Sequence, residues 1–323
     1  MKSFLKVLAI SMLVFSLFVP TGLIAKTKKI KTAIVLASFG TSYPSALKAI
    51  TNIEKEVRKE FGNVTIKHAF TSNIIRKKWH KRRTDKAFHR ENKGLKQFYY
   101  IKGPLATISD LQDEGYKNII VQSTHIFAGE QYEDLCSYID GLNSIKAHKK
   151  KFMPFNKLVI GRPALGKPGN KHPYHHDIEN AVAAVKKDVE EAKRKGAVLV
   201  YMGHGNEYFS TGAYVEFQAM MNKRYKQKTI VGVVEGYPSV DDVVLSLKHM
   251  KAKKVLLKPL MVVAGDHAAN DMASDEDDSW KVILNKIGIE VETKIEGLGE
   301  NSSWAKIYVK HLKDVAKDNG IKI

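Results

Sequence analysis

Apolar residues along this chain fall into short runs that are separated by longer stretches with helical periodicity. Runs rich in Val, Ile and Leu that end at Gly, Ser or Thr are typical of parallel strands covered on both faces. They predict strands at 31–39, 64–70, 118–123 and 157–160, and again at 198–202, 229–234, 254–260 and 291–295. Strands that alternate with helices indicate βαβ units, so we expect an α/β fold.

The two halves of the chain resemble each other at the ends of their predicted strands. The matching pairs are SFGT (38–41) with MGHG (202–205), FT (70–71) with VE (234–235), and FAGEQ (127–131) with VAGDH (263–267). An internal repeat of this kind predicts two similar doubly wound lobes, each a parallel sheet flanked by helices, with a cleft between them. We expect the lobes at 29–160 and 161–323, with a basic insertion at 76–98 in the first.

Three residues at predicted strand ends of the second half suit metal chemistry. His204 follows the first strand as a Gly203-His204-Gly205 turn, Glu235 follows the second and His267 the third. In an open parallel sheet the carboxyl ends of strands border the ligand site. Two imidazoles and a carboxylate are ligands for a divalent transition metal, and they leave open positions as a transfer site requires. Helix capping or a local carboxylate partner would explain each residue equally well when it is taken alone.

Composition limits the classes of protein and of site. Apolar residues make up 44% and charged residues 27%, as in an ordinary globular protein, but the net charge of +19 favours an anionic partner. The single cysteine, Cys136, excludes an intrachain disulfide and a Cys-based zinc or iron–sulfur cluster within one chain. No GxxxxGK[ST] motif is present, so we expect no nucleotide cofactor.

The N-terminus reads as an export signal. Lys2 and Lys6 precede an apolar run that Pro20 ends, and Ala25 is a small residue suited to cleavage. We therefore expect a signal peptide at 1–25 and an exported, periplasmic or extracytoplasmic protein. An uncleaved segment would be its one link to a membrane.

The chain resembles a known family, the anaerobic-type cobalt chelatases (sirohydrochlorin cobaltochelatases) of the class II chelatase superfamily. The stretches that carry the resemblance span the expected mature chain: LASFGTSYPSA (36–46), AFTSNIIRKKW (69–79), GEQYEDL (129–135), GRPALG (161–166), YMGHGNE (201–207), VEGYPS (234–239) and KPLMVVAGDHAANDMASDEDDSW (258–280). The resemblance implies a two-lobed fold with a tetrapyrrole cleft. It also implies ATP-independent insertion of Co²⁺ into sirohydrochlorin for cobalamin synthesis, with Fe²⁺ and Ni²⁺ as other candidate metals.

The resemblance assigns roles to residues of this chain. The family's metal ligands fall on His204, Glu235 and His267, and its pyrrole proton acceptor falls on His204. Substrate contacts are expected from the following residues: Ser38, Phe39, Gly40, Thr41, Glu130, Gly203 and Gly205. The expected partner is an acidic tetrapyrrole rather than a nucleic acid, and a homo-oligomer is compatible with the sequence.

The sequence leaves several alternative functions and residue roles open. The chain is either a chelatase or an exported carrier of a tetrapyrrole, haem or metal with little turnover, and a zinc hydrolase is a third reading. The basic insertion is either a flap over substrate carboxylates or a solvated surface. Trp79 and Phe88 either stack on a macrocycle or pack internally. The HPYHH segment (172–176) is either a metal relay or a surface loop.

Overall fold

The computed structural model describes residues 30–169, 171–206 and 212–323. The expected signal peptide, 1–25, lies outside these residues. Within the described chain, no helix combines the length and the apolar character needed to cross a bilayer.

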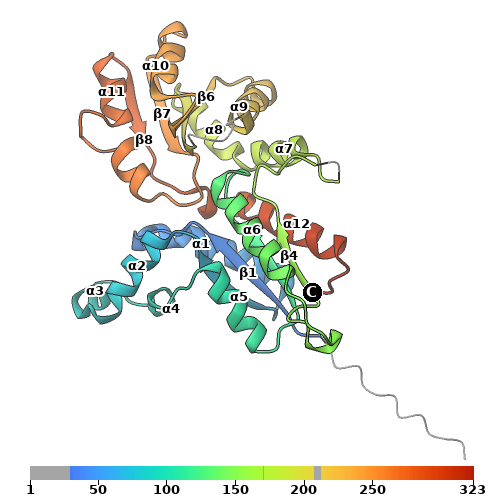
Figure 1. The fold of residues 1–323 in the computed structure, drawn as a ribbon. Coiled ribbons are helices and arrows are strands. Elements are labelled where there is room, and N and C mark those ends of the chain that lie inside the picture. Colours follow the sequence, from blue (N-terminus) through green and yellow to red (C-terminus); the bar gives the residue numbers. More distant parts are fainter. Residues whose placement is uncertain (1–29, 170, 207–211) are drawn as a thin grey trace, which may run out of the picture.

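Two four-stranded parallel sheets form the framework, as the sequence predicts (Figure 1). The first contains β1 (Thr32–Ser38), β2 (Thr65–Phe70), β3 (Asn118–Ser123) and β4 (Lys157–Gly161) in the order β2-β1-β3-β4. The second contains β5 (Val198–Gly205), β6 (Thr229–Glu235), β7 (Lys254–Pro259) and β8 (Glu290–Thr293) in the order β6-β5-β7-β8. The strand order is the same in both sheets, so the internal repeat is structural.

Helices connect the strands and cover the sheets (Figure 1). Those that follow the strands of the first sheet are α1 (Leu47–Phe61), α2 (Asn73–Lys81), α3 (Lys86–Glu91), α4 (Lys96–Tyr99), α5 (Pro104–Asp113) and α6 (Glu130–Asn143). Those that follow β4 and the later strands are α7 (Tyr174–Ala184), α8 (Lys186–Arg194), α9 (Gly212–Tyr225), α10 (Val240–His249), α11 (Trp280–Lys286) and α12 (Ser302–Asp318). Single helical turns also occur, among them η4 (Ala268–Met272).

The segment between β4 and β5 forms two consecutive helices, α7 and α8, rather than one long helix. Val185, between α7 and α8, has a ψ of 16° and so leaves the helical conformation. The break redirects the chain so that α7 packs against α9 while α8 packs against β5.

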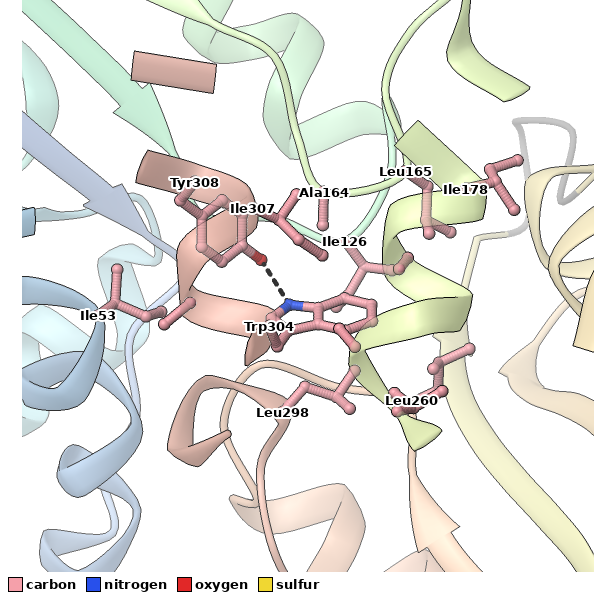
Figure 2. Close-up of a cluster of buried hydrophobic side chains, with 14 of the residues drawn as sticks. Ile53, Ile126, Ala164, Leu165, Ile178, Leu260, Leu298, Trp304, Ile307 and Tyr308 are labelled. Atoms are coloured by element: carbon pink, nitrogen blue, oxygen red, sulfur yellow. Dashed lines mark hydrogen bonds between the residues drawn. The ribbon is translucent and has the colours of Figure 1, made fainter. Parts of the chain in front are cut away.

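The last helix joins the two lobes. Helix α12 follows β8 of the second sheet but packs against α1, β3 and β4 of the first lobe (Figure 1). Its Trp304 is fully buried and lies among apolar side chains from both lobes, including Ile53 and Leu260 (Figure 2). The Trp304 indole donates to the hydroxyl of Tyr308, which in turn donates to the carbonyl of Thr124 beyond β3. One continuous core therefore holds the sheets at a defined distance.

The insertion in the first lobe has a small core of its own. Trp79, Phe98 and Phe70 are buried together, and the Trp79 indole donates to the carbonyl of Thr41 at 2.7 Å. Trp79 therefore packs internally, and Phe88 packs edge-on against it. The buried Trp79 therefore attaches α2 to the segment that follows β1.

Candidate active site

The three expected metal ligands lie side by side at the carboxyl edge of the second sheet. Strands β5 and β6 run in register, with Gly205 opposite Glu235. Nδ1 of His204 lies 3.8 Å from Oε2 of Glu235. The rings of His204 and His267 have centroids 4.7 Å apart. The fold therefore brings together residues that lie far apart in the sequence.

The Gly203-His204-Gly205 segment belongs to a strand and is not a turn, which corrects the sequence prediction. Strand β5 continues through Gly205 because these residues pair with β6. Gly205 has φ of +79°, and a Cβ there would lie 1.9 Å from the carbonyl oxygen of Glu235. Only glycine permits both this backbone conformation and this approach, so Gly205 controls how closely His204 and Glu235 sit.

His267 is oriented by a carboxylate on its own helical turn. Its Nδ1 lies 2.5 Å from Oδ2 of Asp271, and the two residues are four positions apart at η4, a turn of π-helix. A carboxylate at Nδ1 fixes the tautomer and leaves Nε2 available to a metal. Single π-turns are frequently found at functional sites.

The three side chains are partly exposed, with 42% of His204, 45% of Glu235 and 36% of His267 accessible to solvent. No three His, Cys, Asp or Glu side chains of the described ranges are already gathered tightly enough to hold a metal ion. The exposure leaves each side chain room to change rotamer. The three side chains are neighbours, and His204 lies next to both Glu235 and His267.

A pocket of about 440 Å³ lies between the lobes and borders these residues. His204, Glu235 and His267 line one side of it. Six of the residues expected to contact substrate also line it: Ser38, Phe39, Gly40, Thr41, Glu130 and Gly205. Gly203 is the exception, since it lies inside β5 beneath the ring of Tyr214.

Apolar side chains form most of the remaining wall. They come from strand ends and loops of both lobes and include Phe39, Ile74, Ile126, Phe127, Leu260 and Val263. Phe127 packs against Tyr214, which also lines the pocket, with ring centroids 5.2 Å apart. An apolar wall beside titratable residues suits a flat, partly hydrophobic ligand.

Two polar contacts cross the pocket from lobe to lobe. The Tyr43 hydroxyl donates to Oδ1 of Asp266 at 2.8 Å. Nδ2 of Asn206 donates to Oε2 of Glu130 at 3.2 Å. Asp266 precedes His267 and Asn206 follows β5, so both contacts join the edge that carries the expected metal ligands to the opposite lobe.

His125 also lines the pocket, although sequence reasoning missed it. It follows β3 by two residues, and its Nδ1 lies 2.8 Å from the hydroxyl of Ser123. Burial lowers the pKa of His125 to about 4, so the imidazole is neutral at neutral pH. The signal in the sequence is the position of His125 shortly after a strand of the first half.

The HPYHH segment does not reach this pocket. Nε2 of His172 lies 2.8 Å from a carboxylate oxygen of Asp318 in α12. The rings of His175 and His176 lie 4.3 Å apart on the first turn of α7. The segment thus lies on the surface, where His172 joins it to the C-terminal helix.

Known proteins match this chain along most of its length. The family described as cobalt chelatase (CbiK) matches residues 32–317. The sirohydrochlorin cobaltochelatase of Salmonella typhimurium (strain LT2) is 33% identical over 284 residues, covering 87% of this chain and 95% of that protein. The sirohydrochlorin cobaltochelatase CbiKC of Nitratidesulfovibrio vulgaris is 26% identical over 284 residues, covering 87% and 89%.

A solved structure supports the fold. The sirohydrochlorin chelatase SirB of Bacillus subtilis subspecies spizizenii, determined in complex with cobalt, superposes with a TM-score of 0.54 at 10% identity. The match covers 90% of this chain and 97% of that one. The expected two-lobed chelatase fold is thereby confirmed, and with the match over residues 32–317 the chain belongs to the cobalt chelatase (CbiK) family.

Proposed function

We propose that this protein inserts Co²⁺ into sirohydrochlorin, in the anaerobic route to cobalamin. The observation that carries the proposal is that His204, Glu235 and His267 lie together on one side of a largely apolar pocket between the lobes. Family membership supports the reaction class, and the names of the relatives support the substrate. The metal is a substrate here rather than a resident cofactor.

The ligand set suits a metal that must be released. Two imidazoles and one carboxylate leave coordination positions open, so the pyrrole nitrogens of the tetrapyrrole can replace the protein ligands in turn. Since His204, Glu235 and His267 are partly exposed, the ion can enter without displacing a buried side chain. The same ligands accept Fe²⁺ and Ni²⁺, and metal supply then selects among them.

Metal insertion also requires two pyrrole N–H protons to leave. We assign His204 as the acceptor because it lies between Glu235 and His267 at the pocket wall. A neutral imidazole has one nitrogen lone pair that accepts a proton, and the proton can pass on to water. Proton transfer and ligand exchange need no nucleotide, so the proposed reaction is independent of ATP.

The expected signal peptide adds a location to the proposal. We propose that the protein acts outside the cytoplasm, where it meets exported or imported metal. A mass measurement of the mature protein from an extracytoplasmic fraction tests this point, and a full-length mass in the cytoplasmic fraction would contradict it.

Anaerobic spectrophotometry tests the proposed activity. Mature protein, sirohydrochlorin and Co²⁺ are mixed, and the absorbance change of metal insertion is compared with a protein-free control. We expect a rate that rises in proportion to protein concentration. If the tetrapyrrole binds stoichiometrically but metal insertion is no faster than in the control, the protein is a carrier instead. Competition among Co²⁺, Fe²⁺ and Ni²⁺ in the same assay measures the metal preference.

A further inference from the structure

Helix α2 presents one short face to the pocket. Ile74, Ile75 and Lys78 line the pocket, and the first and last of them are four residues apart. Residues at this spacing lie on the same side of a helix. Ile74 is 69% exposed despite its apolar side chain, so this face has an apolar surface and a cation that the protein itself does not cover.

Three of the four arginines of the same insertion, Arg76, Arg82 and Arg83, donate hydrogen bonds within the fold. The Arg76 guanidinium donates to the carbonyls of Phe70 and Thr71 at the end of β2. Arg82 donates to the carbonyl of Ser42 and lies over the rings of Trp79 and Phe88.

Arg83 completes this group, since its Nε donates to the carbonyl of Tyr99 at 2.9 Å. These three arginines thus bind backbone carbonyls at the end of β2, after β1 and in α4. Their charges are directed into the insertion and its neighbours rather than into the pocket.

Lys78 differs from these arginines. Among the described residues that line the pocket, it is the one Lys or Arg. Within the described chain, its ammonium makes no hydrogen bond or ion pair. The carboxylates of the lining are Glu130, Glu235 and Asp266, which belong to the opposite side or to the contacts between lobes. The pocket is therefore acidic where a metal would enter and basic at α2.

We infer that Lys78 binds a peripheral carboxylate of the tetrapyrrole and thereby selects acidic macrocycles. The inference rests on the proposed function, because it takes the tetrapyrrole as the ligand. Ile74 and Ile75 contact the apolar edge of the ring system while Lys78 neutralises the adjacent carboxylate. An ammonium on a flexible stem follows a carboxylate on a flexible side chain, and the uncovered apolar face at Ile74 gives the ring a surface to rest on.

The test compares Lys78→Gln with Lys77→Gln, which removes the same charge from the neighbouring position that does not line the pocket. Lys78→Gln should raise the KM for sirohydrochlorin about tenfold and leave kcat unchanged, since a charge-assisted contact is lost from binding alone. Lys78→Arg should restore most of the affinity. Equal KM values for the two Gln variants would overturn the inference.

Binding without metal keeps the inference separate from the proposed reaction. Metal-free sirohydrochlorin is titrated into each variant, together with a form whose carboxylates are esterified. We expect Lys78→Gln to weaken binding of the free acid about tenfold and to leave binding of the ester unchanged. If Lys78→Gln weakens binding of the free acid and of the ester equally, Lys78 does not recognise the carboxylate. If wild-type protein binds sirohydrochlorin but shows no turnover, the proposed reaction is wrong. The difference in binding between wild type and Lys78→Gln still tests the role of Lys78.

Discussion

The imidazole rings of His204 and His267 lie edge to face, with centroids 4.7 Å apart and ring planes at 90°. One ring comes from the end of β5, and the other from a helical turn that follows β7. Strands β5 and β7 are hydrogen-bonded neighbours in the sheet, so their ends are held at a fixed separation. The sheet therefore brings the segments that carry both imidazoles to the same edge.

The first prediction concerns the carboxylate behind His267. Asp271→Asn removes the charge that lies 2.5 Å from Nδ1 of His267, so the ring loses the partner that orients it. Changes in such outer partners typically weaken a metal site about 10- to 100-fold. We expect the KM for Co²⁺ to rise about tenfold or more, with sirohydrochlorin binding unchanged. Asp277→Asn, at an exposed carboxylate paired with Lys286, is the control and should have no effect. Similar KM values for both variants would remove Asp271 from the site.

The second prediction concerns the approach of β5 to β6. Gly205→Ala places a methyl group 1.9 Å from the Glu235 carbonyl at a φ of +79°, so the strands must separate. We expect a stability loss of about 1–3 kcal/mol and a large loss of metal insertion, because His204 and Glu235 move apart. Gly203→Ala is the matched control, since its methyl group meets only side chains and does so at 3.2 Å. Urea unfolding and the insertion assay measure both effects, and full activity in Gly205→Ala would contradict the account.

The third prediction concerns stability in acid. The hydrogen bond from His68 is the main reason that the pKa of Glu54 falls from 4.5 to about 2. The folded protein therefore holds this carboxylate charged, and the stability it contributes is present above pH 4.5 and is lost as the pH falls toward 2.

Urea unfolding of Glu54→Gln across this pH range measures that contribution. The variant should be less stable than wild type at pH 6, and the difference should shrink steadily below pH 4.5. Glu190→Gln, at a half-exposed carboxylate, should follow the wild-type profile. A gap between Glu54→Gln and wild type that does not depend on pH would refute the assignment.

The fourth prediction concerns the core that joins the lobes. Trp304→Ala removes a fully buried side chain that contacts both lobes, as Figure 2 shows, and should cost about 3–5 kcal/mol. Trp304→Phe should cost clearly less because it keeps most of the apolar contact. Because one core spans both sheets, wild type should unfold in a single transition by fluorescence and by circular dichroism. Two separate transitions would show that the lobes are independent.

Much of the fold could be predicted because apolar runs and strand ends are local signals. The six residues Asn118–Ser123 are all buried, and the sequence places this strand at the same bounds. Glycine and charged residues after the runs also locate the carboxyl ends of strands, which is why His204, Glu235 and His267 stand out. In a parallel sheet such positions meet at one edge, so the candidate site follows from the order of the elements.

Other features depend on contacts between distant residues and leave no local pattern. Helix α12 crosses to the first lobe, where Trp304 is buried. In sequence α12 looks like any other amphipathic helix, so this crossing could not be predicted. The strand character of Gly203–Gly205 depends on pairing with β6, whereas two glycines alone indicate a turn. The difference between the arginines that bind backbone carbonyls and the pocket-lining Lys78 likewise depends on which carbonyls lie nearby.

The most direct test of the central claim measures cobalt insertion and sirohydrochlorin binding in the same samples of wild type and His204→Ala. The account predicts catalysed insertion by wild type and an uncatalysed rate with His204→Ala. Both proteins should bind metal-free sirohydrochlorin with similar affinity, because His204 acts on the metal and the pyrrole protons. Catalysis by His204→Ala at the wild-type rate, or a wild-type rate no higher than that without protein, would contradict the account.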